Sequence, residues 1–116
     1  MPKGSSVLIT GSAMGIHPHS ISVSYGVSKA AVHSLVKNLV KCLASTELRI
    51  NAIAPGFVET EWQKEKPEWI KEKIKSKIAL KRFCTTEEVG RLAMNIIENE
   101  YLNGEIIQFD GGYNFE

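Results

Sequence analysis

A tyrosine and a lysine four residues apart form the first group in this sequence that could do chemistry. Tyr25 and Lys29 stand at the start of a segment with helical periodicity, and this spacing places two side chains on one face of a helix. A phenol ordinarily ionises at about pH 10, too high for efficient proton transfer at neutral pH. Because an adjacent ammonium and a helix N-terminus both stabilise the phenolate, the pair predicts a general acid or base at Tyr25.

A serine thirteen residues before the tyrosine is the second candidate. Ser12 follows the apolar, β-branched run at residues 7–10, which predicts a strand buried on both faces. In an open parallel sheet, ligands bind at the carboxyl ends of the strands. We therefore expect Ser12 to face the same site as Tyr25.

The elements that must position these side chains alternate along the chain. The predicted strands cover residues 7–10, 49–54 and 105–109. The predicted helices begin at about residue 25, at Pro67 and after the capping box at 85–88, each with an apolar stripe, and the second stripe includes Trp69. Residues 11–24 and 57–66 are predicted to be loops. This alternation predicts an α/β fold, a partial Rossmann-like (doubly wound) parallel sheet of about three strands with crossover helices.

The composition describes a single small domain without a strong charge bias. The chain has 116 residues, 43% of them hydrophobic, and a formal net charge of +1, which favours neither nucleic acid nor a membrane surface as a partner. No apolar stretch approaches the roughly 20 residues of a membrane span. Cys42 and Cys84 lie far apart without clustered ligands, so we expect no metal site, two buried or half-buried free thiols and a cytoplasmic location.

Basic residues concentrate between Glu61 and Arg82. This stretch holds eight of the fourteen lysines and arginines and only four glutamates. One interpretation is the solvated face of an amphipathic helix. The other is a basic surface that attracts an anionic carrier or a phosphate-bearing substrate.

Five segments, in this order, resemble the short-chain dehydrogenase/reductase family. They are a strand ending at Ser12, YGVSKAA at 25–31, RINAIAPGFVET at 49–60, KRFCTTEEVG at 81–90 and NGEIIQFDGGY at 103–113. Together they cover nearly the whole chain. The resemblance implies an oxidoreductase that transfers hydride between NAD(P)H and a carbonyl or alcohol substrate, and it implies an unusual left-handed crossover before the last strand.

The resemblance also implies roles for individual residues. Tyr25 is expected to donate a proton to the substrate's carbonyl oxygen, and Ser12 to hold that oxygen by a hydrogen bond. Lys29 is expected to lower the pKa of Tyr25 and to bind the nicotinamide ribose. The expected cofactor contacts are Tyr25, Lys29, Pro55, Gly56, Val58 and Thr60.

Residues 10–17, TGSAMGIH, are similar to the family's phosphate loop as well as to its serine strand. His17 stands where the phosphate loop requires a third glycine, and a side chain there blocks the close approach of phosphate. The Tyr-Lys pair also follows too soon for a complete nucleotide-binding half to intervene. We therefore interpret the segment as the serine strand. The remaining histidines match no catalytic position, so His17, His19 and His33 are predicted in loops or on a helix surface.

The resemblance places residues 1–116 in the C-terminal half of a family domain, with the N-terminal nucleotide-binding half absent. We therefore expect this chain alone to bind NAD or NADP weakly or not at all and to be inactive. Its first strand would be central in a complete sheet, and its long helix carries the flat Ala30-Ala31 patch. Both surfaces favour a homo-oligomer.

Three functions stay open at this point. The leading one is that the complete protein reduces a 3-oxoacyl-carrier-protein or another small carbonyl substrate. The next is a sugar or polyol dehydrogenase of the same family, and the third is a catalytically silent, oligomerising half-domain. An acidic carrier needs a positive surface, so the basic stretch at 61–82 favours the first.

Overall fold

The computed structural model of this protein describes residues 1–20 and 22–114. Its elements in chain order are β1 (Ser6–Thr10), the 3₁₀ helix η1 (Ala13–Gly15), α1 (Val23–Cys42), β2 (Arg49–Pro55), α2 (Glu61–Lys64), α3 (Glu68–Ser76), α4 (Thr86–Glu98) and β3 (Ile106–Phe109). The predicted strands and the three predicted helices are all present in the predicted order.

The three strands form one parallel sheet in the order β1-β2-β3. Ser6 pairs with Arg49 across the first strand pair, and Ala52 pairs with Ile106 across the second. Residues 49–54 of the central strand are buried, whereas the two edge strands are mostly half-buried. The predicted α/β class and partial Rossmann-like sheet are confirmed.

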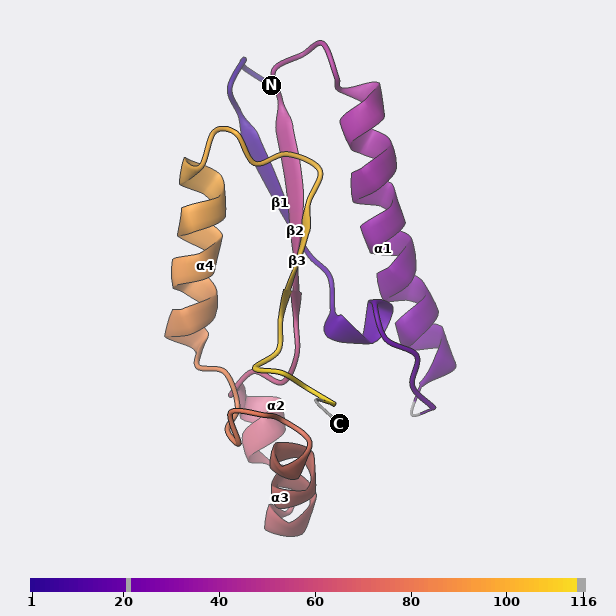
Figure 1. The fold of residues 1–116 in the computed structure, drawn as a ribbon, viewed down its shortest axis with the longest axis vertical. Coiled ribbons are helices and arrows are strands. Elements are labelled where there is room, and N and C mark those ends of the chain that lie inside the picture. The colour runs from indigo at the N-terminus through magenta and orange to yellow at the C-terminus, as the bar shows by residue number, and fades with distance from the viewer. Residues whose placement is uncertain (21, 115–116) are drawn as a thin grey trace.

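Helices α1 and α4 cover opposite faces of this sheet (Figure 1). Ile50 and Ala52 pack on the α1 side, whereas Arg49 reaches carbonyl groups of α4, as expected from alternation along a strand. The crossover from β1 to β2 and the crossover from β2 to β3 each move to the next strand in the same direction across the sheet. Their helices, α1 and α4, lie on opposite faces. The two crossovers therefore have opposite hands, and one of them is left-handed, in agreement with the unusual crossover that the resemblance implies.

The apolar core on the α1 side is small. It is centred on Val36, Ile50 and Ala52, each no more than 2% exposed. Half-buried apolar residues surround this centre: Val7, Ile9, Leu39, Val40, Leu43 and Ile106. The predicted three- and four-residue spacing along α1 is what brings its members of this cluster onto one face.

Polar side chains fasten the amino end of β2 to the end of α4, and we call Arg49 and Asn51 the clamp. The buried guanidinium of Arg49 donates to four carbonyl oxygens, those of Ile96, Ile97, Asn99 and Leu102, at 2.5–3.2 Å. The fully buried Asn51 donates to the carbonyl of Leu102 and accepts from the amide of Glu105, at 2.9 and 3.0 Å. A cation at this position also stabilises the C-terminal end of the α4 dipole.

Several local predictions are wrong. Residues 11–24 were predicted to be a loop but contain η1 and the start of α1, because Ser12 and Ser22 each cap a helix. Ile21 lies outside the described residues. Residues 57–66 were also predicted to be a loop but contain the short helix α2. Trp69 is 69% exposed because α3 extends beyond the sheet and buries none of its residues (Figure 1).

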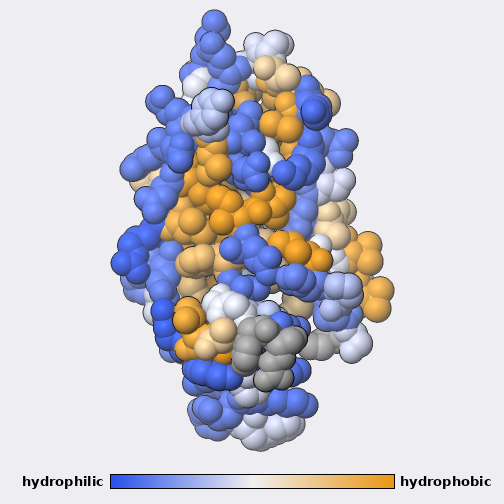
Figure 2. Space-filling view, in the orientation of Figure 1, coloured by the Kyte–Doolittle hydropathy of each residue, from blue (hydrophilic) through white to orange (hydrophobic). Residues whose placement is uncertain are grey.

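The sheet edges and the outer side of α1 leave apolar surface uncovered. Figure 2 shows an apolar area between α4 and α1, surrounded by hydrophilic residues. On α1, Val23, Val27 and Leu35 are 73%, 64% and 48% exposed. An open strand edge and an apolar helix surface are features that other chains can cover.

The remaining features of the fold are the hydropathy of its helices, its possible metal ligands and its two cysteines. Within the described residues, no helix is long and apolar enough to span a bilayer, and no group of three or more His, Cys, Asp or Glu side chains could hold a metal ion. Both cysteines are free. Cys84 is half-buried as predicted, but Cys42 is exposed because it ends α1 on the side away from the core.

Candidate active site

A cavity of about 540 Å³ opens at the carboxyl ends of β1 and β2. Figure 1 shows the N-terminal end of α1 and the short helix α2 at this same end of the sheet. Four of the predicted site residues line the cavity: Ser12, Tyr25, Pro55 and Gly56. Because this is the edge where open parallel sheets bind their ligands, the cavity is the candidate active site.

Ser12 is fixed by hydrogen bonds on both its side chain and its backbone. It is 6% exposed and caps η1, where its Oγ accepts from the amide of Met14 at 3.1 Å. Its own amide donates to Nε2 of His33 at 3.2 Å. Since Oγ acts as an acceptor within the protein, its hydroxyl hydrogen is left for a second partner.

His33 links α1 to the end of the serine strand, so its predicted surface position is wrong. It is 8% exposed, since it lies three residues before the core residue Val36 on the same side of the helix. Burial, and then the nearby Lys29 cation, lower the pKa of His33 below its ordinary value. A neutral ring is the form that can accept from the Ser12 amide. Gly11 makes room for this ring, because a Cβ there would overlap His33 Nε2.

Tyr25 and Lys29 lie one turn apart at the start of α1, as predicted. The Lys29 Nζ is 5.7 Å from the centroid of the Tyr25 ring, and it donates to the carbonyl of Thr10 at 3.4 Å. Tyr25 is 44% exposed, and its amide donates to the capping hydroxyl of Ser22 at 3.3 Å. The ammonium therefore stands beside the phenol and ties it to the strand that leads into Ser12.

The predicted cofactor segment divides into two parts. Pro55 and Gly56 line the cavity, and the glycine is required there because a Cβ would lie 2.7 Å from the Cβ of Asp110. Val58 and Thr60 do not line it. Val58 forms an isolated bridge with the segment before α4, and the exposed Thr60 precedes α2 without a capping bond from its side chain.

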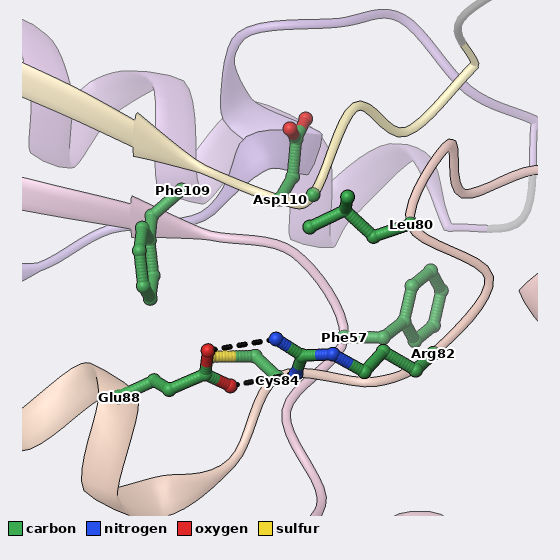
Figure 3. Close-up of a pocket in the computed structure, with 8 residues that line it drawn as sticks. Phe57, Leu80, Arg82, Cys84, Glu88, Phe109 and Asp110 are labelled. Atoms are coloured by element: carbon green, nitrogen blue, oxygen red, sulfur yellow. Dashed lines mark hydrogen bonds and ion pairs between the residues drawn. The ribbon is translucent and has the colours of Figure 1, made fainter.

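A smaller pocket of about 90 Å³ lies next to this segment (Figure 3). There Arg82 donates two hydrogen bonds to the carboxylate of Glu88, at 2.7 and 2.9 Å. Mainly through these bonds, the pKa of Glu88 falls from its ordinary 4.5 to about 2. Glu88 also closes the predicted capping box with Thr85, which is confirmed. The neighbouring Cys84 amide donates to the carbonyl of Phe57 at 2.9 Å, so this pocket supports the cofactor segment.

Sequence reasoning singled out none of three polar residues that border the main cavity. Gln63, in α2, is 7% exposed, and His19 is half-buried. The Lys66 ammonium lies 4.3 Å from the ring centroid of Trp62 and 5.4 Å from that of Phe57. The one signal in the sequence is the three-residue spacing of Gln63 and Lys66, hidden in a segment predicted to be a loop.

Part of the basic stretch lies on helices, where lysines pair with glutamates of the same helix. Lys64, Lys71 and Lys75 each form an ion pair with a glutamate three residues earlier, at 3.2–3.6 Å. Lys66 differs from these three, since it borders the cavity and its ammonium lies over two aromatic rings. Burial lowers its pKa below the ordinary value.

The sequence matches a family model over nearly its whole length. A model described as enoyl-(acyl carrier protein) reductase matches residues 1–114. The chain is also 36% identical, over 112 residues, to the 3-oxoacyl-[acyl-carrier-protein] reductase FabG of Thermotoga maritima. That alignment covers 95% of this chain and 46% of the relative.

Two solved structures resemble the fold closely. The 3-hydroxyacyl-CoA dehydrogenase type-2 from Mycobacterium avium has a TM-score of 0.91 and 29% identity, over 100% of this chain and 47% of its own. BdcA in complex with NADPH has a TM-score of 0.89 and 26% identity, over 97% of this chain and 47% of its own. The chain spans about half the length of all three of these proteins.

The family match includes the strand that leads to Ser12, the Tyr25–Lys29 turn and the last strand of the sheet. The parallel sheet itself superimposes on the two solved oxidoreductase-fold structures. By both its sequence and its fold, this chain belongs to the short-chain dehydrogenase/reductase family of oxidoreductases.

Proposed function

We propose that this chain is the catalytic and substrate-binding half of an NAD(P)-dependent reductase that acts on the ketone of a 3-oxoacyl thioester. One observation carries the proposal. Ser12 and Tyr25 come from different elements but line one cavity, and the Lys29 ammonium lies 5.7 Å from the tyrosine ring. In this proposal, residues 1–116 form the C-terminal half of a domain whose other half supplies most of the nucleotide site.

The proton is donated by Tyr25 to the substrate's carbonyl oxygen. As the proton leaves, the phenolate that forms is stabilised by the cation of Lys29. Ser12 donates to the same oxygen, since its Oγ already accepts from the amide of Met14 and its hydroxyl hydrogen remains to be used. Two donors directed at one oxygen stabilise the negative charge that develops on it.

NAD(P)H, when bound, supplies the hydride. Pro55 and Gly56 border the cavity beside Tyr25, where they can lie against a nicotinamide ring. The Lys29 ammonium has one long bond to the Thr10 carbonyl, so it can also donate to ribose hydroxyls. Val58 and Thr60 follow along the chain and are proposed to contact the cofactor's amide or pyrophosphate. The NADPH complex of BdcA supports this class of cofactor.

The chain alone is expected to bind this cofactor weakly or not at all. Strand β1 runs into a three-residue 3₁₀ helix, and α1 begins only at Val23. A phosphate loop instead places a glycine turn directly before the N-terminus of an α-helix. Residues 10–17 therefore lack the geometry that would hold a pyrophosphate, which supports their interpretation as the serine strand.

The cavity lining supports an acyl thioester as the substrate rather than a sugar or polyol. Met14, Pro55, Phe57 and Trp62 give it apolar walls beside the polar side chains of Ser12, Tyr25 and Gln63. A polyol needs a hydrogen-bond partner for each hydroxyl group, whereas an acyl chain needs apolar contact. The acyl-carrier and CoA thioesters in the names of two relatives support the same class.

A chimera tests the proposed function. The nucleotide-binding half of the Thermotoga maritima reductase is joined to residues 1–116, and oxidation of NADPH by an acetoacetyl thioester is followed. We expect Tyr25→Phe to lower kcat by about 10²–10⁴-fold, the usual contribution of a general acid. Tyr101→Phe is the matched control, because Tyr101 is fully exposed. A chimera that binds NADPH but reduces the thioester equally well with and without the Tyr25→Phe substitution would refute the proposal.

The uncovered surfaces support a second proposal, that the chain forms a homo-oligomer. The exposed apolar residues of α1 are Val23, Val27 and Leu35, next to the exposed Ala30 and Ala31. We expect Val27→Glu to shift the mass measured by light scattering toward the monomer, because it places a charge in this surface. Asn95→Glu, on an exposed position of α4, controls for added charge alone. A monomeric wild-type chain would contradict this second proposal.

A further inference from the structure

Gln63 lines the active-site cavity and has an unusual side-chain oxygen. The residue is only 7% exposed, and its Oε1 has no hydrogen-bond partner anywhere in residues 1–20 or 22–114. A buried acceptor left unpaired lowers the stability of the fold, so native proteins leave few of them. Because Gln63 lines the cavity, a ligand there can supply the missing donor.

His19 adds a second unpaired group to the same cavity. Both of its ring nitrogens are buried, and neither has a partner among the residues that the structure describes. The ring packs against α1, with Nε2 3.0 Å from the position that a Cβ on Gly26 would take. A neutral imidazole offers one donor and one acceptor. His19 and Gln63 therefore border the cavity from two different segments, and each has hydrogen-bonding capacity that the described residues do not use.

Lys66 supplies a donor at the same wall. Its ammonium is held over the rings of Trp62 and Phe57, at 4.3 and 5.4 Å from their centroids. Cation–π contacts hold the position of an ammonium but leave its N–H groups able to donate to an oxygen. The cavity thus has an acceptor at Gln63 and a donor at Lys66, three residues apart in the chain.

We propose that Gln63, His19 and Lys66 form a subsite for a secondary amide in the arm that carries the acyl thioester. When the Gln63 side chain turns toward the cavity, an amide can present an N–H to its oxygen and a carbonyl to the Lys66 ammonium, so one ligand group satisfies both residues. A carboxylate would satisfy only the cation and would turn its lone pairs toward Gln63 Oε1. This inference rests on the proposed function, because it assumes that the ligand is a thioester with such an arm.

Two thioesters that differ only in the amide test the subsite on the chain as it exists. One is the S-(2-acetamidoethyl) thioester of acetoacetate, and the other is its S-pentyl analogue, in which methylenes replace the amide. Binding is followed by the fluorescence of Trp62, which borders the cavity, in a Trp69→Phe background. We expect the amide thioester to bind about tenfold more tightly, the effect of one or two well-formed hydrogen bonds.

Variants at Gln63 separate a binding role from a structural one. Gln63→Leu should bind the two thioesters equally, whereas Gln63→Glu keeps an acceptor oxygen and should keep the preference for the amide. Lys66→Met should also reduce the preference. Gln108→Leu, at an exposed glutamine outside the cavity, is the matched control and should leave the tenfold preference unchanged.

Four results would overturn the subsite. The first is equal binding of both thioesters by the wild-type chain, and the second is equal weakening of both by Gln63→Leu. The third is tighter, Lys66-dependent binding of free acetoacetate, and the fourth is no saturable change in fluorescence with either thioester. The first would mean that water serves these atoms, and the third would make this a carboxylate site. Each is a binding result on this chain. Failure of the proposed function is read separately, as turnover of the chimera that does not depend on Tyr25.

Discussion

The two ends of the parallel sheet differ in how completely their buried polar groups are hydrogen-bonded. At the amino end of β2, the clamp residues Arg49 and Asn51 are buried and hydrogen-bonded to the end of α4. At the carboxyl end, Gln63 Oε1 and both ring nitrogens of His19 are buried without partners among the described residues. Ser6 Oγ is the fourth buried atom without a partner among the described residues, and it lies at the amino end, where Ser6 pairs with Arg49.

This difference separates residues that stabilise the fold from residues that await a ligand. Hydrogen bonds within the clamp offset the desolvation of its polar groups, so the clamp holds α4 against the sheet. The unpaired atoms at the other end lower stability until something binds to them. The carboxyl end is also where Ser12 and Tyr25 lie. Three of the four unpaired atoms in the described residues thus belong to residues of the cavity that holds the catalytic motif.

The largest effect should come from breaking the clamp. Arg49→Met keeps much of the side chain's length but leaves four carbonyl oxygens without their donor, so we expect a loss of about 2–4 kcal/mol in the free energy of unfolding. Urea denaturation measures it. Arg91→Met, at an exposed position of α4, is the control and should change stability by less than about 0.5 kcal/mol. A loss below about 1 kcal/mol for Arg49→Met would contradict the stabilising role of the clamp.

The next largest effect is expected at the contact between Gly11 and the ring of His33, the residue that accepts from the Ser12 amide. A methyl group at Gly11 would overlap the His33 ring, so Gly11→Ala should lower stability by about 1–3 kcal/mol. In a His33→Ala background the same substitution should cost much less, because the obstructing ring is gone. A double-mutant cycle by urea denaturation measures this coupling. Additive losses would show that the ring moves aside and that the contact does not fix the serine strand.

The sequence predicted the elements with strong periodicity better than the side chains between them. The strands and the Thr85–Glu88 capping box follow from local patterns, and so does the one-turn spacing of Tyr25 and Lys29. His33 was misplaced because its role depends on the approach of α1 to β1, which no local pattern encodes. The brief helix α2, which carries Gln63, was also missed.

The site was predictable only where a motif marked it. Ser12 and Tyr25 were found through their spacing and the resemblance, and the structure brings them to one cavity. The subsite residues Gln63, His19 and Lys66 belong to two polar segments that carry no motif. They meet only because the carboxyl ends of the strands gather those segments, which is a tertiary effect.

A smaller effect, of opposite sign to that of the clamp, is expected at the carboxyl end. Gln63→Leu removes an unpaired buried oxygen, so stability should stay unchanged or rise by up to about 1 kcal/mol. Asn51→Leu is the matched comparison, because it removes a buried amide whose bonds are made and should destabilise the protein. Urea midpoints of the two variants give the contrast. Equal losses would remove the distinction between the two ends of the sheet.

The smallest effect concerns the Glu88–Arg82 pair that supports the cofactor segment (Figure 3). The pKa of Glu88 is about 2 in the folded protein, against an ordinary value of 4.5. Its contribution to stability is therefore complete above pH 4.5 and is lost as the pH falls from 4.5 through 2. The difference in urea midpoint between wild type and Glu88→Gln should shrink across this interval.

Comparing the wild type with this variant isolates one carboxyl group, since all others titrate in both proteins. Glu87→Gln, one residue earlier on the exposed surface of α4, should show no comparable narrowing. A difference that stays constant from about pH 7 to about pH 2.5 would mean that the two hydrogen bonds from Arg82 do not hold the segment in solution. The site end of the sheet would then owe its geometry to backbone bonds, such as those of the Cys84 amide to Phe57 and of the Glu59 amide to Cys84.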